Sequence, residues 1–331
     1  MTGQPLNATF FAFKKRERGG VLTGASVAYL VVAVVLLGAF IALNYQGVGA
    51  IIQWYGSLVS AAAEGKSPAT AMSAVPAGFV MFFLTLIPFM FAFYILLAAY
   101  EAACLRWMIR GERNGLMGLS LGGDTWRVYL TYWIWFGLYM GLSIVFGLLT
   151  FVAIGASAVS GNAEHVATMG GPLVLIVTLV RMLVTLFFAI RLAPAAATSV
   201  GRQQFSFFDA WKVTKGRFWS LFGAFFIVIV IAAIGEIIFG AIVLSIIGAS
   251  VLPQIMSAGA NPSEAQVGEI FATLFTAQNA IVLAVAYAIL LALSLIIYLL
   301  FFGINARAVL AAAEDGKIDG VPNAAVANTF T

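Results

Sequence analysis

Long apolar segments alternate with short polar ones along the whole chain. Six of the apolar segments are long enough to cross a hydrocarbon core of about 30 Å as helices that rise about 1.5 Å per residue. Their expected bounds are 21–43, 75–103, 128–155, 172–199, 219–250 and 279–311. The pattern predicts an all-α, polytopic integral membrane protein in which residues 1–331 form a single transmembrane domain. The first segment exceeds the apolar core of a secretory signal, so we expect it to remain as a membrane span.

The composition excludes a soluble globular domain. Of the 331 residues, 63% are hydrophobic and 9% are charged, whereas soluble domains carry about 25% charged residues. Cys104 is the single cysteine and His165 the single histidine. An intrachain disulfide and a metal site built from several such side chains are therefore excluded, and we expect no cofactor.

Basic residues lie on one side of the predicted membrane. They are Lys14, Lys15, Arg16, Arg18, Arg106, Arg110, Arg113, Arg127, Arg202, Lys212, Lys215, Arg217, Arg307 and Lys317. The loops on the other side contain Lys66 as their single basic residue. The positive-inside rule predicts that both termini are cytoplasmic. This topology explains the net charge of +4 without a nucleic-acid partner, and the composition favours a bacterial cytoplasmic (inner) membrane.

Three segments outside the spans are expected to form amphipathic helices at the membrane interface: residues 48–63, 206–218 and 261–275. The middle one combines aromatic and basic side chains, a pattern suited to anionic lipid headgroups. The candidate headgroup residues are Trp126, Arg127, Trp211, Lys212, Lys215 and Arg217.

A weak internal repeat connects these elements. The sequence DTWRV at 124–128, before the third span, recurs as DAWKV at 209–213, before the fifth span. Late in the fourth span, FFAI at 187–190 recurs as FFGI at 301–304 in the sixth. Repeated helical hairpins of parallel orientation explain both matches. The chain then contains either two such hairpin units or three, with residues 10–18 leading into a diverged first unit.

One segment carries a family resemblance. The sequence SFFDAWKVTKGRFW at 206–219 resembles the element that precedes spans in the bacterial membrane domain accompanying some glycerophosphodiester phosphodiesterases, and in related uncharacterised inner-membrane families. The rest of the chain matches only in hydropathy. Catalysis in the fused enzymes belongs to a separate soluble barrel that this sequence does not contain. The resemblance therefore implies an association with membrane lipids and no phosphodiesterase activity.

Two ionisable residues lie deep within predicted spans, Arg181 in the fourth and Glu236 in the fifth. Charged groups there cost several kcal/mol and usually find a partner. Helical rise places Arg181 about 14 Å and Glu236 about 21 Å from the ends of their spans, depths compatible with an ion pair. The alternatives are a proton or substrate relay, an anionic headgroup site at Arg181, and two unpaired charges beside a water-filled cleft.

Other residues have structural interpretations. Gly137 and Gly141 form a GxxxG pattern that predicts close helix packing, either within the bundle or against another subunit. Glu101 is expected to pair with a nearby arginine, Cys104 to be a buried thiol, and Arg191 to extend toward the interface. Pro88 and Pro194 are candidate helix kinks.

Three classes of function remain open. The favoured one is a non-catalytic inner-membrane protein that binds lipid or a membrane-protein partner, as an accessory subunit, scaffold or homo-oligomer. The second is a small-molecule or lipid transporter that uses Arg181 and Glu236. The third is an intramembrane enzyme, which needs converging nucleophiles, acids or metal ligands where the sequence offers scattered hydroxyls and two deep charges.

Overall fold

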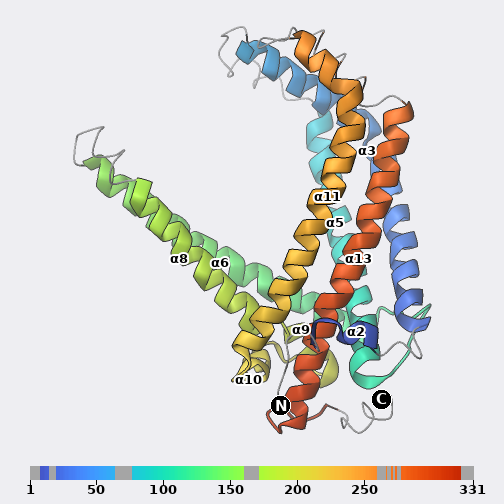
Figure 1. The fold of residues 1–331 in the computed structure, drawn as a ribbon, viewed down its shortest axis with the longest axis vertical. Coiled ribbons are helices and arrows are strands. Elements are labelled where there is room, and N and C mark those ends of the chain that lie inside the picture. The colour runs from blue at the N-terminus through green and yellow to red at the C-terminus, as the bar shows by residue number, and fades with distance from the viewer. Residues whose placement is uncertain are drawn as a thin grey trace. The chain divides into compact units, whose positions relative to one another are not determined.

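The computed structural model describes residues 8–14, 20–63, 77–159, 171–258, 266, 270, 273 and 277–321. Its long helices are α3 (Gly20–Ala63), α5 (Ala77–Arg110), α6 (Gly123–Val159), α8 (Gly171–Leu192), α11 (Phe218–Ala258) and α13 (Ala277–Glu314) (Figure 1). The short helical elements are α2 (Phe11–Lys14), α9 (Ala195–Gly201), η3 (Phe207–Asp209) and α10 (Ala210–Thr214). The predicted all-α class is confirmed.

Within the residues that the structure describes, six helical segments are long and apolar enough to cross a membrane: Gly20–Asn44, Gly78–Arg110, Gly123–Val152, Gly171–Gly201, Phe218–Ile246 and Val285–Glu314. Large apolar side chains cover their outer surfaces, among them Val35, Leu148, Leu183 and Ile237. Such surfaces suit lipid because a helix satisfies its own backbone hydrogen bonds and leaves only side chains to the hydrocarbon. The chain is a multi-pass membrane protein.

The first long helix differs from the expectation. Residues 48–63 are helical, but they continue α3 without a break and do not form a separate interfacial helix. The junction contains Gly47 and Gly49 and no proline, and a glycine costs a helix only about 1 kcal/mol. Residues 266, 270 and 273 are helical. The rest of the predicted helix at 261–275 lies outside the described residues, as do Lys15, Arg16, Arg18, Lys66 and His165.

Proline acts differently in two spans. Pro88 lies inside α5, which continues past it. At Pro194, α8 ends at Leu192 and α9 begins at Ala195, which confirms the interruption expected there. Proline lacks an amide hydrogen and its ring collides with the preceding turn. The Pro194 carbonyl accepts a hydrogen bond from the Thr198 amide at 2.8 Å, so the short helix starts at once.

The chain divides into two compact units. Unit 1 comprises residues 1–25, 98–226 and 299–331, and unit 2 comprises residues 26–97 and 227–298. In unit 1, α6 packs along α8, and α9 packs against α6 (Figure 1). The core of unit 1 contains the fully buried side chains Tyr100, Leu105, Val128, Val200, Phe207, Val213, Ile304 and Val309.

Equivalent positions of the sequence repeat are buried alike in unit 1. Thr125 and Ala210, which follow the two repeated aspartates, are both 0% exposed. Ala12 is 2% exposed. It precedes an aromatic and a basic residue, Phe13 and Lys14, just as Thr125 and Ala210 each precede a tryptophan and a basic residue. A Cβ added at Gly303 would lie 2.9 Å from the Ala12 amide nitrogen, so the first copy docks closely on α13. Whether the chain contains two units or three stays a prediction.

Candidate functional site

Two connections between spans carry most of the candidate residues, and we call them elbows. The first elbow, residues 111–127, joins α5 to α6, and the second elbow, residues 202–219, joins α9 to α11. Both belong to unit 1. Each has ion pairs that fix its shape, buried in the first elbow and half-buried in the second, and exposed aromatic or apolar side chains.

Asp124 organises the first elbow. Its carboxylate lies in the first turn of α6 and is buried. It accepts hydrogen bonds from Arg110 Nη2 at 2.7 Å and Arg127 Nη1 at 2.7 Å, and Arg106 Nη1 lies 3.4 Å away. The buried Arg106 also donates from Nη2 to the Gly118 carbonyl at 2.9 Å. Ion pairs and the positive end of the helix dipole together stabilise this buried carboxylate.

Gly115 and Gly118 shape the turn that Arg106 holds. Both have positive φ, 79° and 99°, which side chains disfavour. A Cβ at Gly115 would lie 1.9 Å from the Leu119 carbonyl oxygen, so glycine is required there. The turn leaves Leu116 and Leu121 largely exposed, 80% and 67%. These apolar tips are a feature that the sequence reasoning missed.

Asp209 organises the second elbow in the same way. It pairs with Lys212 Nζ at 2.7 Å and with Arg202, which also donates to Ser206 Oγ at 3.3 Å. The hydrogen bond from Lys212, with the charge of Arg202, lowers the pKa of the Asp209 carboxyl below its ordinary value. The elbow therefore contains an ionised carboxylate throughout the physiological pH range.

Aromatic and basic side chains cover the outside of the second elbow. Phe208 and Trp219 are 74% and 77% exposed, and Trp211 is 41% exposed. The Lys212 side chain is 67% exposed, and Lys215 is exposed. Lys215 has no carboxylate partner among the described residues. This combination of rings and ammonium groups is typical of a membrane interface.

The remaining candidate headgroup residues divide into two groups. Trp126 is exposed, as expected for an interfacial residue. Arg127 is engaged with Asp124, and Arg217 donates to Asp315 Oδ2 at 2.6 Å and to the Ala311 carbonyl at 3.0 Å. These two arginines therefore stabilise the elbows from within, and Lys212 and Lys215 are the outward-facing cations.

Arg191, in the last turn of α8, contacts aromatic rings. Its guanidinium carbon lies 5.1 Å from the centroid of the Trp211 ring and 5.6 Å from those of Phe187 and Phe218. It also donates from Nη1 to the Thr214 carbonyl at 3.2 Å. Cation–π contacts thus anchor the end of α8 to the second elbow. Arg191 thus makes a specific contact that holds Trp211 in place, and its extension toward the interface stays a prediction.

Glu101 has a different partner from the one expected. Its Oε2 atom accepts a hydrogen bond from the Tyr132 hydroxyl at 2.5 Å, and its side chain is buried. The predicted pairing with an arginine is wrong because Arg106 and Arg110 are directed to Asp124. Cys104 is 0% exposed, as predicted.

The two intramembrane charges lie in different units. Arg181, in unit 1, donates from Nη2 to Ser143 Oγ at 3.0 Å and to the Tyr139 hydroxyl at 3.5 Å. These are contacts across the α6–α8 hairpin. Glu236 belongs to unit 2. The ion pair between the two residues stays a prediction.

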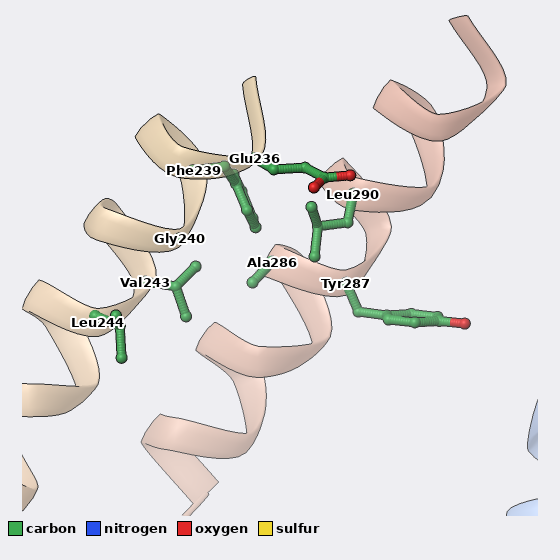
Figure 2. A pocket seen from close by; sticks show the side chains of 8 residues that line it. All are labelled: Glu236, Phe239, Gly240, Val243, Leu244, Ala286, Tyr287 and Leu290. Atoms are coloured by element: carbon green, nitrogen blue, oxygen red, sulfur yellow. The ribbon is translucent and has the colours of Figure 1, made fainter. Parts of the chain in front are cut away.

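Glu236 lines a groove between α11 and α13. The groove has a volume of about 670 Å³ and is lined by Glu236, Phe239, Gly240, Val243, Leu244, Ala286, Tyr287 and Leu290. Figure 2 shows the Glu236 carboxylate reaching from α11 toward α13 beside Leu290. Glu236 is the one charged residue of the lining.

The GxxxG face of α6 is open. Nothing among the described residues lies within 4 Å of a Cβ added at Gly137 or Gly141. Trp133, Met140 and Ile144 on the same helix are exposed as well. Packing of this face inside the bundle stays a prediction, as does packing against another subunit.

Comparison of the chain with models of protein families, with curated proteins and with solved structures finds no match. The resemblance of residues 206–219 to the phosphodiesterase-associated membrane domain therefore stays a prediction.

Proposed function

We propose that this is a non-catalytic protein of the bacterial inner membrane, with both termini cytoplasmic, that binds anionic lipid headgroups at its elbows. The observation that carries the proposal is the outer surface of the second elbow. There, Phe208 and Trp219 are three-quarters exposed beside the exposed Lys212 and Lys215.

Aromatic side chains of this exposure are poorly accommodated in water and well accommodated at the headgroup level of a bilayer. A basic residue near an anionic membrane surface contributes about 1 kcal/mol. The second elbow offers two such residues. Lys215 is exposed and has no carboxylate partner among the described residues. Lys212 pairs with Asp209 but keeps 67% of its side chain exposed, so both ammonium groups are accessible to lipid phosphates. A scaffold or accessory subunit that organises anionic lipid fits this arrangement.

Lipid selectivity tests the proposal. Spin-labelled phosphatidylglycerol and phosphatidylcholine are compared in vesicles that contain the protein, and the motionally restricted fraction of each label is measured. We expect the wild type to prefer phosphatidylglycerol. In the double variant Lys212→Gln/Lys215→Gln, the loss of each lysine should lower this preference by about fivefold.

The matched control is Lys212→Arg/Lys215→Arg, which keeps both charges and should keep the preference. An unchanged preference in the glutamine variant would show that these lysines do not select lipid. A preference that is absent in the wild type would remove the proposal and favour a protein partner at the elbow.

Transport is a second candidate function, favoured by the carboxylate of Glu236 in a membrane-embedded groove. Ionisable residues at such depth often mark substrate pathways. Flux into proteoliposomes distinguishes transport from binding, because a scaffold binds its ligand without moving it across the bilayer.

A further inference from the structure

Glu236 is chemically out of place in its helix. It lies within the span Phe218–Ile246, and its neighbours Ile234, Ile237 and Ile238 are exposed apolar side chains. Within the described residues of unit 2, no hydrogen bond or ion pair engages its carboxylate. A carboxylate in hydrocarbon costs several kcal/mol unless a cation or a proton neutralises it. The groove beside it therefore contains a charge that needs a counter-charge or a proton.

The groove arises from the way two helices separate. At Gly235, a Cβ would lie 3.1 Å from Leu293 Cδ2, so glycine permits the close contact of α11 with α13. Five residues further along α11, Gly240 contributes no side chain, and a Cβ there would meet nothing within 4 Å among the described residues. Ala286 on α13 is also small. The helices approach closely at Gly235. Beside Glu236 they leave a hollow that Gly240 and Ala286 line (Figure 2).

The lining defines the chemistry of a ligand. Apart from Glu236 and the Tyr287 hydroxyl, the side chains are apolar. The volume of about 670 Å³ lies in the range of small-molecule sites. A ligand with an apolar body and a single positive charge would fill the hollow and neutralise the carboxylate. A neutral ligand would leave the carboxylate to be neutralised by a proton, and an anion would be repelled.

We propose that the groove between α11 and α13 binds an amphipathic organic cation through Glu236. The site lies in unit 2 and is separate from the elbows, so this proposal goes beyond the headgroup binding of unit 1. The proposal commits to a ligand cation as the counter-charge of Glu236. The alternative is that Arg181 neutralises Glu236, and the experiment distinguishes this ion pair from a bound ligand cation.

A pair of ions with the same shape provides the test. Tetraphenylphosphonium and tetraphenylborate have nearly the same size and opposite charge, so simple partitioning into apolar surfaces is matched. Equilibrium dialysis of the radiolabelled ions against the full chain in mild detergent gives the two affinities. We expect saturable binding of the cation with a stoichiometry near one, and Glu236→Gln should weaken it by about tenfold or more. Binding of the borate should be weak and unchanged.

Two glycine variants separate the hollow from the charge. Gly240→Leu fills the groove and leaves Glu236 in place, and we expect it to abolish cation binding. Gly248→Leu is the matched control, because a Cβ at Gly248 also meets nothing within 4 Å and Gly248 does not line the groove. Circular dichroism and gel-filtration profiles establish that each variant is folded.

Either of two results would overturn the proposal. The first is equal binding of both ions, or equal cation binding by the wild type and Glu236→Gln. The second is cation binding that appears only in Arg181→Gln, which would assign Arg181 as the natural partner of Glu236. The phosphatidylglycerol preference of Glu236→Gln, measured in parallel, should be that of the wild type, so failure here is distinguishable from failure at the elbows.

Discussion

Asp124 and Asp209 occupy equivalent positions in two sequence repeats, and each carboxylate pairs with the basic residue three positions further along, Arg127 and Lys212. Each also pairs with an arginine that follows or ends the preceding span, Arg110 and Arg202. The repeat therefore encodes an ion cluster that fixes the entrance of the chain into the next span. The aspartates are structural, and the exposed residues around them are free to contact lipid.

Asp124 should contribute strongly to stability because three arginines surround its buried carboxylate. Asp124→Asn leaves those cations without a counter-charge, and we expect a loss of about 3–5 kcal/mol. Chemical unfolding in detergent, followed by circular dichroism, measures the loss. The control is Glu112→Gln, since Glu112 is 42% exposed and also pairs with Arg110. Exposed pairs contribute at most about 1 kcal/mol. Equal losses in the two variants would contradict the assigned role.

Asp209 should make stability depend on acid pH. Its folded-state pKa is lowered, so its contribution is complete above the ordinary carboxyl pKa of about 4 and disappears as the pH falls through the lowered value. We expect Asp209→Asn to be less stable than the wild type at pH 7 and nearly as stable at pH 2. Unfolding curves at both values give this difference. A constant difference between the two pH values would show that the ionised carboxylate is not what stabilises the elbow.

Glu101 and Tyr132 should be energetically coupled. Tyr132→Phe removes the hydroxyl that binds the buried carboxylate at 2.5 Å, and we expect a loss of about 1–3 kcal/mol. Glu101→Gln/Tyr132→Phe should lose less than the sum of the single variants, because either change alone already removes the contact. A double-mutant cycle on thermal unfolding measures the coupling. Additive losses would mean that the two groups act independently.

The open GxxxG face of α6 should tolerate larger side chains. A Cβ at Gly137 or Gly141 meets nothing within 4 Å among the described residues, and replacing glycine in a helix by leucine removes a cost of up to about 1 kcal/mol. Gly137→Leu and Gly141→Leu should therefore be as stable as the wild type. Gly303→Leu is the contrasting variant, because Ala12 lies against that glycine and the substitution should destabilise the chain. Destabilisation by Gly137→Leu in monomeric protein would place another helix on this face.

Hydropathy predicts the spans because a bilayer imposes one requirement on all of them, about 20 apolar residues in a helix. Each of the six candidate spans overlaps one expected from the sequence. The continuous α3 was missed because Gly47 and Gly49 are weak breakers, whereas the break at Pro194 follows from the missing amide hydrogen.

The side-chain contacts were less predictable. The sequence predicts that Arg217 and Arg127 contact lipid headgroups. In unit 1, however, they pair with Asp315 and Asp124. Tyr132 binds Glu101 from another helix, a contact that depends on how the two helices are rotated about their axes. Hydrophobic periodicity carries little of that information when a helix is apolar on every side. The Asp124–Arg127 and Asp209–Lys212 pairs follow from the i, i+3 spacing of the repeat, whereas the pairs with Arg106, Arg110 and Arg202 do not.

Native mass spectrometry of the protein, extracted from its membrane in a mild detergent at native expression level, tests the central claim most directly. Lipid binding at the elbows predicts that an anionic phospholipid leaves the membrane with the wild type, and that most of it is lost from Lys212→Gln/Lys215→Gln. A stoichiometric protein partner without retained anionic lipid, or equal retention of that lipid by both proteins, would contradict the claim.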